Sequence, residues 1–307
     1  MGGGMAGGIE SLLTEQRNPA SQSIDGASLE EMLSIINDED AKVAGAVRAE
    51  IPQIARAVEA ISQAFERDGR LFYMGAGTSG RLGVLDASEC PPTFNVPPEQ
   101  VQGIMAGGEA ALARATEASE DDPAAGVRDL KAHGFTSLDV LVGIAASGRT
   151  PYVLGAVREA RRLGAVTVGI SCTQNSELAA IVDIAITPLC GPEIVTGSTR
   201  MKAGTATKLV LNMLSTGSMI RTGHVYGNLM VNVQPRNAKL LDRAQRIVRD
   251  AAGVTTNEAA RVLDRSGNIV KTAIVMARTG LEKKPAEDLL AHSGGRVARA
   301  LKEHSHK

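Results

Sequence analysis

The chain has 307 residues, of which 43% are hydrophobic and 2% aromatic, and its 33 basic and 34 acidic residues almost cancel. A chain of this length can bury a substantial core, in one large α/β domain or in two smaller ones. The balanced charge offers no basic surface for nucleic acid, and no apolar run approaches the roughly 20 residues of a membrane span. The sequence therefore predicts no nucleic-acid partner and no membrane, and small metabolites are the expected ligands.

The three cysteines, Cys90, Cys172 and Cys190, stand far apart and form no Cys-x-x-Cys pair. An odd number of widely spaced cysteines argues against a disulfide framework or structural zinc and fits a reducing cytoplasm. The glycine-rich residues 1–10 lack the charged region and apolar core of a signal peptide, and we expect them to be flexible. These features predict a cytoplasmic protein without a metal.

Residues 11–60 predict a helical lead-in that packs on the main domain. Ser28 and Glu31 have the spacing of a capping box, and apolar residues follow them at helical intervals. A second apolar stripe runs over residues 43–65, where Pro52 is expected to interrupt or kink the helix.

From Arg70 onward, short apolar runs alternate with segments of helical length. Strands that helices cover on both faces have continuous apolar runs, and the spacing here leaves room for crossover helices. We therefore predict an α/β domain over residues 61–236, with three layers and a doubly wound, mainly parallel five-stranded sheet. The predicted strands are residues 71–74, 101–106, 140–145, 166–170 and 181–186.

The remainder of the chain predicts helices. Residues 198–221 are rich in small residues and methionine, which suits either the core or an oligomer seam. Residues 237–307 predict a small helical domain, because short helical patterns there are separated by glycines. These patterns include residues 258–263, 269–276 and 286–290.

A glycine-rich loop, residues 75–80, follows the first predicted strand and leads into a predicted helix at 81–87. Glycines allow a tight turn there, and backbone N–H groups at a helix start face an anion. The Gly-x-Gly-x-x-Gly spacing is shared with dinucleotide-binding proteins. On its own it leaves a dinucleotide, a phosphosugar or a structural turn open.

Three observations favour the phosphosugar. The hydroxyls of Thr78 and Ser79 can donate to the terminal oxygens of a phosphate monoester. The third strand runs into a second hydroxyl-rich loop ahead of Pro151, which suits a first helical turn. The acidic residue expected on a dinucleotide's ribose is poorly matched by Glu109. The predicted phosphate-binding residues are Gly77, Thr78, Ser79, Gly80, Ser147, Gly148, Arg149 and Thr150.

A third cluster of glycine, hydroxyls and cations opens the long helix at residues 196–202. It is either a capped helix start with solvated charges or a further contact with substrate. The candidate substrate contacts are Thr196, Ser198, Arg200 and Lys202.

Two carboxylates are candidates for proton transfer. Glu89 precedes Pro91 and Pro92 at the predicted end of the helix after the first loop, and helical rise puts it roughly 10–15 Å from a bound phosphate. Glu120 lies in an acidic run before Pro123, where a charge at a helix start is the ordinary interpretation. The residues alone leave both as solvated charges or catalytic groups. His224 is the one histidine that directly follows the long helix.

The chain resembles the bacterial N-acetylmuramic acid 6-phosphate etherases, a family of the sugar isomerase (SIS) domain superfamily related to glucokinase regulatory protein. The resemblance runs from about Leu12 to the C-terminal helices. Its motifs are long and specific; they comprise residues 37–40, 75–83, 86–92, 143–152 and 195–205.

The resemblance implies an SIS fold, a homodimer, no metal or redox cofactor, and a carbon–oxygen lyase. Such an enzyme cleaves the D-lactyl ether of N-acetylmuramic acid 6-phosphate during cell-wall sugar recycling. The family's catalytic glutamates fall on Glu89, as proton donor, and Glu120. A phosphosugar-sensing regulator and an aldose–ketose isomerase share the fold and remain the alternatives.

Overall fold

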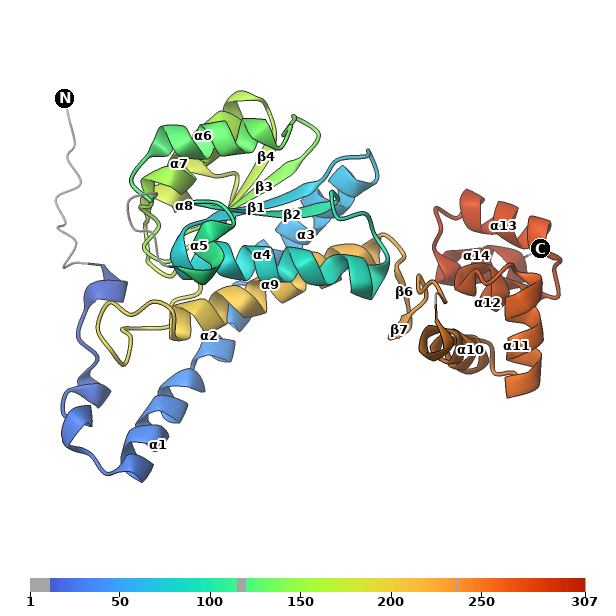
Figure 1. Ribbon diagram of the computed structural model, residues 1–307, viewed down its shortest axis with the longest axis horizontal. Helices are drawn as coiled ribbons and strands as arrows, with labels where there is room; N and C mark the ends of the chain where they lie inside the picture. Colours follow the sequence, from blue (N-terminus) through green and yellow to red (C-terminus); the bar gives the residue numbers. More distant parts are fainter. Residues whose placement is uncertain (1–11, 115–119, 236, 307) are drawn as a thin grey trace. The chain divides into compact units, whose positions relative to one another are not determined.

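The computed structural model describes residues 12–114, 120–235 and 237–306, so the predicted flexible stretch 1–10 lies outside the described residues (Figure 1). The chain forms two compact units, one of residues 1–88 with 98–215 and one of residues 89–97 with 216–307. Along the chain, this division falls within the residue ranges of α4 (Gly77–Phe94) and α9 (Lys202–Arg221). The boundary predicted from the sequence, near residue 237, lies further along the chain than this division.

The first unit contains a parallel five-stranded sheet with the strand order β2-β1-β3-β4-β5, which confirms the predicted fold class. The last strand is shorter than predicted, because Ile181 ends helix α8 instead of beginning a strand. The strands are β1 (Leu71–Gly75), β2 (Val101–Met105), β3 (Val140–Ile144), β4 (Val166–Ile170) and β5 (Ile184–Ile186).

Helices cover both faces of this sheet, as continuous apolar strands require (Figure 1). One face bears α6 (Pro123–Ala132), α7 (Pro151–Arg162) and α8 (Glu177–Ile181), and the core between them contains Phe72, Leu141 and Leu178. The other face bears α3 (Ile51–Phe65), α4 and α9. Lys208 on α9 lies 3.6 Å from the buried Asp86 on α4, which ties these two helices together.

The N-terminal lead-in has the predicted helices. Ser28 and Glu31 form the predicted capping box at the start of α1 (Leu29–Asp40). The second apolar stripe is divided between α2 (Val43–Ala49) and α3, and Pro52 lies in the first turn of α3, where a missing N–H breaks no helical hydrogen bond. Within residues 12–28, short 3₁₀ helices precede α1; they are η2 (Leu13–Glu15), η3 (Pro19–Ser21) and η4 (Ile24–Gly26).

Helix α4 is longer than predicted at both ends. It begins at Gly77 inside the glycine loop and continues past Pro91 and Pro92 to Phe94. Burial of Cys90 and Phe94 stabilises the turn that contains the prolines, and Asn95, with φ +52°, ends the helix in the left-handed conformation. Glu89 therefore lies within the helix and not at its end.

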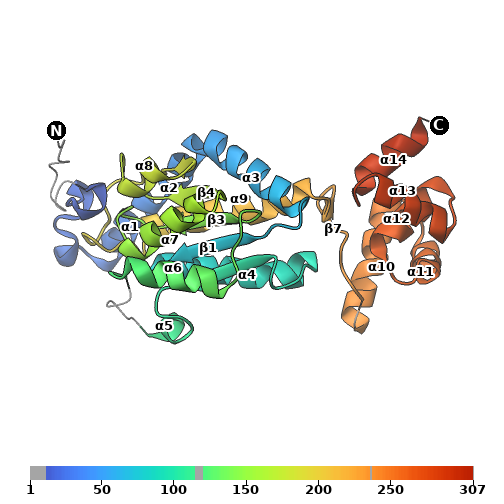
Figure 2. The same cartoon turned by 90° about the horizontal axis from the view of Figure 1, so that it is seen from above.

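The second unit includes a short hairpin, β6 (Val225–Tyr226) and β7 (Leu229–Met230). A helical bundle follows the hairpin along the chain (Figure 2). Its core includes Val248, Leu263 and Ile274, and the described helices exceed the predicted patterns in number and length. They are α10 (Ala238–Ala252), α11 (Thr256–Arg265), α12 (Val270–Thr279), α13 (Lys283–His292) and α14 (Val297–Ser305). None of the helices in the described ranges is long and apolar enough to cross a membrane.

Candidate functional site

The predicted phosphate loops follow β1 and β3, which are neighbours in the sheet and end in register, Gly75 opposite Ile144. From this pair the chain winds outward in two directions, to β2 on one side and to β4 on the other. Ligands of open parallel sheets bind at such a reversal, outside the carboxyl ends of the strands. Both loops therefore lie where this fold forms its binding crevice.

The first loop, residues 75–80, bends sharply from β1 into α4. A methyl group added to Gly80 would lie 2.6 Å from the carbonyl oxygen of Gly75, so no side chain fits there. Gly77 has φ +53° and is already the first residue of α4. Thr78 and Ser79 are partly exposed at the helix start, where N–H groups and hydroxyls can bind an anion together.

The second loop, residues 146–150, joins β3 to α7 and has similar properties. Gly148 has φ +66°, and a Cβ there would lie 2.3 Å from the Cβ of Ser176. The Arg149 N–H donates to the Ser147 hydroxyl oxygen at 3.3 Å. Thr150 is the N-cap of α7, yet its side chain makes no capping hydrogen bond. The hydroxyl of Thr150 is thus not required by the helix.

Glu120 lies beside the first loop and is bonded to the helix that follows the second loop. Its carbonyl oxygen accepts a 3.0 Å hydrogen bond from the N–H of Tyr152, in the first turn of α7. Its Oε1 would lie 3.4 Å from a Cβ built on Gly77, in the first loop. The cap of α6 is Asp122, whose carboxylate accepts from the N–H of Ala124. Glu120 is therefore not the helix cap, and its carboxylate faces the first loop.

Glu89 is exposed on α4, nine residues beyond Gly80, which is about 14 Å of helical rise. This part of α4 belongs to the second unit, whereas both loops and Glu120 belong to the first. The role of Glu89 therefore rests on its motif.

The third cluster divides into exposed and buried residues. Thr196 and Arg200 are exposed and Ser198 is partly exposed, while α9 begins only at Lys202. Lys202 is 1% exposed, and its ammonium lies 2.5 Å from Oε2 of Glu39. The structure thus favours a role for Lys202 in holding the fold together over a role in binding a ligand.

Sequence reasoning missed the buried carboxylate that binds Lys202. Burial alone would raise the pKa of Glu39, but hydrogen bonds from Lys202, Lys42 and Asn18 outweigh it and lower this pKa to about 2. The available signal was the motif at residues 37–40, which carried the family resemblance without an assigned role.

His224 lies in the second unit, half-buried, with its Nδ1 3.1 Å from the Thr222 hydroxyl. Burial, and then the nearby Lys271, lower the pKa of His224 to about 4. It is therefore a neutral imidazole at pH 7. Within the described ranges, no group of three or more His, Cys, Asp or Glu side chains is arranged to hold a metal ion.

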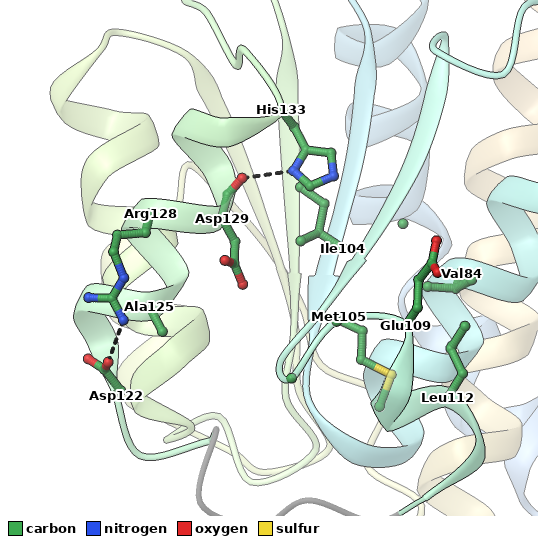
Figure 3. Close-up of a pocket in the computed structure, with 13 residues that line it drawn as sticks. Val84, Ile104, Met105, Glu109, Leu112, Asp122, Ala125, Arg128, Asp129 and His133 are labelled. Atoms are coloured by element: carbon green, nitrogen blue, oxygen red, sulfur yellow. Dashed lines mark hydrogen bonds and ion pairs between the residues drawn. The ribbon is translucent and has the colours of Figure 1, made fainter.

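A cavity of about 680 Å³ lies beside the edge strand β2, between α6 and the α4–α5 side (Figure 3). Helix α5 spans Ala110–Ala113. Arg128 of this cavity pairs with Asp122, and the His133 ring contacts the Asp129 carbonyl oxygen at 2.8 Å. None of the predicted site residues lines it.

Residues 53–161, which include both loops and Glu120, match the glucokinase regulatory protein N-terminal SIS domain. The sheet order, the two loops and this match define a protein of the SIS class. A phosphoheptose isomerase from Neisseria gonorrhoeae, 19% identical, aligns with a TM-score of 0.49 over 62% of this chain and 98% of its own.

Relatives named N-acetylmuramic acid 6-phosphate etherase match nearly the whole chain. The relative from Edwardsiella ictaluri is 55% identical over 96% of this chain and 98% of its own length. That from Aeromonas hydrophila is 56% identical over 94% and 97%, and that from Clostridium botulinum 52% over 96% and 98%. The chain belongs to the N-acetylmuramic acid 6-phosphate etherase family, which confirms the resemblance seen in its motifs.

Proposed function

We propose that this protein is a lyase that cleaves the D-lactyl ether of N-acetylmuramic acid 6-phosphate, giving N-acetylglucosamine 6-phosphate and D-lactate. The choice of substrate is supported by the names of its relatives, which state this activity. The observation that carries the proposal is Glu120, whose carboxylate lies beside Gly77 of the first loop and whose carbonyl oxygen is bonded to α7, which follows the second loop. A base beside a sugar-phosphate crevice is what this chemistry requires.

Each stage of the reaction involves a proton transfer. In the open-chain sugar, the C2 proton is acidified by the C1 aldehyde, and the lactyl oxygen on C3 is β to the carbanion that forms. A base removes the C2 proton, the C3–O bond breaks, and an acid protonates the departing lactate. Water then adds to C3 of the unsaturated aldehyde while C2 regains a proton. Each positioned acid or base typically contributes about 10²–10⁴-fold.

We assign Glu120 as the base and Glu89 as the acid. The contact of Glu120 with Gly77 supports the first assignment, and the family motif at residues 86–92 supports the second.

The charge of Glu120 also indicates how the substrate lies. A carboxylate near Gly77 repels a phosphate dianion bound at the same point. We therefore propose, in place of the phosphate binding at both loops that the sequence predicts, that the phosphate binds at the second loop alone, at Ser147, Arg149 and Thr150. The C1–C3 end then lies near Thr78 and Ser79, within reach of Glu120.

We also propose that the enzyme acts as a homodimer in the cytoplasm, within cell-wall sugar recycling. Two leucines one turn apart on α1, Leu29 at 71% exposure and Leu33 at 57%, support a protein contact on that helix. The sequence pattern of the cysteines supports a reducing compartment.

The test is to incubate the purified protein with N-acetylmuramic acid 6-phosphate and identify the products. Equimolar D-lactate and N-acetylglucosamine 6-phosphate are expected. A ketose phosphate without lactate would show an isomerase instead, and tight binding without turnover would show a regulator.

A further inference from the structure

A buried ionic cluster joins three segments that are far apart in the chain. It consists of Asn18 before α1, Glu39 at the end of α1, Glu193 before α9, and Lys202 at the first position of α9. All four side chains are nearly inaccessible, with exposures of 5%, 5%, 2% and 1%. Charges in such a position are retained only with close partners, because the desolvation of each is unfavourable.

Lys202 is fixed at both ends. Its ammonium lies 2.5 Å from Oε2 of Glu39, which also accepts a 3.0 Å hydrogen bond from the Asn18 amide. Its backbone N–H donates to Glu193 at 3.0 Å, and the next N–H, of Ala203, donates to the other oxygen of Glu193 at 2.9 Å. The carboxylate of Glu193 thus occupies the N-terminus of α9, where a negative charge is favourable.

The same helix start lies against the first predicted substrate loop and is linked to the second through Cys172. A Cβ built on Gly204 would lie 3.5 Å from Cγ2 of Thr78, in the first loop. Cys172 donates its N–H to the carbonyl oxygen of Ala146, in the second loop, at 2.8 Å, and its Sγ lies 3.9 Å from the carbonyl oxygen of Ala203. A displacement of the first turn of α9 therefore reaches both loops.

The lead-in is bonded to the segment that precedes this turn. The Asn18 amide donates to the carbonyl oxygen of Pro192 at 2.9 Å, and the Ser21 hydroxyl donates to that of Ile194 at 2.8 Å. These bonds and the cluster hold residues 192–202 from both sides. The exposed residues Thr196 and Arg200 lie within this stretch.

We propose that Glu39, Glu193 and Lys202 are positioning residues, which hold residues 196–200 and the first turn of α9 against the two substrate loops. This inference rests on the proposed function, since it assigns these residues to the same site. Lys202 acts through the backbone that it fixes and does not touch the substrate. The motif at residues 37–40 thereby gains a role: Glu39 anchors the end of α1 to the first residue of α9.

The experiment compares the wild type with the double variant Glu39→Gln/Lys202→Met. Removing both charges together avoids an unpaired buried ion, so the protein is expected to fold. The positioning role predicts that KM for N-acetylmuramic acid 6-phosphate rises about tenfold or more while kcat changes little, because misplaced contacts weaken ground and transition states alike. Calorimetric binding of N-acetylglucosamine 6-phosphate should weaken by a similar factor.

The matched control is Lys42→Met, which removes the exposed partner of the same carboxylate and should leave KM unchanged. A folded double variant with the KM of the wild type would overturn the inference. If the double variant does not fold, Glu193→Gln replaces it, with the same expected rise in KM and the same contrary result. A wild type without lactate release or sugar-phosphate binding would instead refute the proposed function.

Discussion

Glu120 and Glu89 differ in how their positions are specified. The carbonyl of Glu120 is bonded to α7 and its carboxylate faces Gly77, whereas Glu89 is carried on an exposed part of α4. Replacing either with glutamine keeps the shape of the side chain and removes its proton chemistry. We predict that Glu89→Gln and Glu120→Gln each lose about 10²–10⁴-fold in kcat.

Calorimetry should show that both variants still bind N-acetylglucosamine 6-phosphate. Glu109→Gln is the control, because Glu109 lines the separate cavity beside β2 and should not affect turnover. Normal activity in either catalytic variant would reject the role of that residue.

The two loops are predicted to bind different parts of the substrate. Ser147→Ala should weaken binding of both inorganic phosphate and the sugar phosphate, by roughly tenfold or more for one lost hydrogen bond to a charged group. Ser79→Ala should weaken binding of the sugar phosphate but not of inorganic phosphate. Inhibition of turnover by inorganic phosphate measures phosphate binding, and KM measures binding of the sugar phosphate. Equal losses for phosphate in the two variants would contradict the proposed orientation.

The buried carboxylate of Glu39 makes stability depend on pH. Its pKa is about 2 in the folded protein and 4.5 as the ordinary value, so its contribution is complete above pH 4.5 and is lost as pH falls toward 2. Urea unfolding should therefore show that the difference in stability between wild type and Glu39→Gln shrinks over this range. Glu159, whose pKa is also about 2, is present in both proteins, so its contribution cancels in the difference in stability. A difference independent of pH would be contrary to this account.

At the scale of elements, α6 and α7 meet through glycines. A Cβ on Gly126 would lie 2.0 Å from the carbonyl oxygen of Tyr152, and one on Gly155 would lie 2.1 Å from that of Pro123. We predict that Gly126→Ala lowers the free energy of unfolding by about 1–3 kcal/mol or more, because the helices must separate.

The control for this pair of helices is Gly45→Ala on α2, where nothing lies within 4 Å of the added carbon. That change should raise the free energy of unfolding by about 0.5–1 kcal/mol, the usual gain from alanine within a helix. Urea titration of both variants measures the contrast. Similar values for the two would mean that the contact of α6 with α7 is not tight.

The sheet could be predicted from the sequence because each of its strands is a continuous apolar run next to a helical pattern. The capping box at Ser28 and the break near Pro52 were also readable, since both are local effects. The continuation of α4 through Pro91 and Pro92 was not, because burial of Cys90 and Phe94 overrides the local preference. The helical conformation of Ile181, at the end of α8, was also not predicted.

The site was predictable in part. The glycine and hydroxyl loops follow strands, and the topology of a parallel sheet brings the ends of β1 and β3 together. The partner of Lys202 was not predictable, because Glu39 is 163 residues away in the chain and no local pattern joins them. The contact of Glu120 with Gly77 likewise depends on the fold.

At the scale of the whole molecule, the proposed activity is a single chemical sequence: removal of the C2 proton, loss of lactate, and addition of water. The most direct measurement is the reaction of N-acetylmuramic acid 6-phosphate with the protein in D₂O, followed by NMR. We expect that D-lactate is released and that the N-acetylglucosamine 6-phosphate formed carries deuterium at C2. Lactate release with the original proton still at C2 would contradict it.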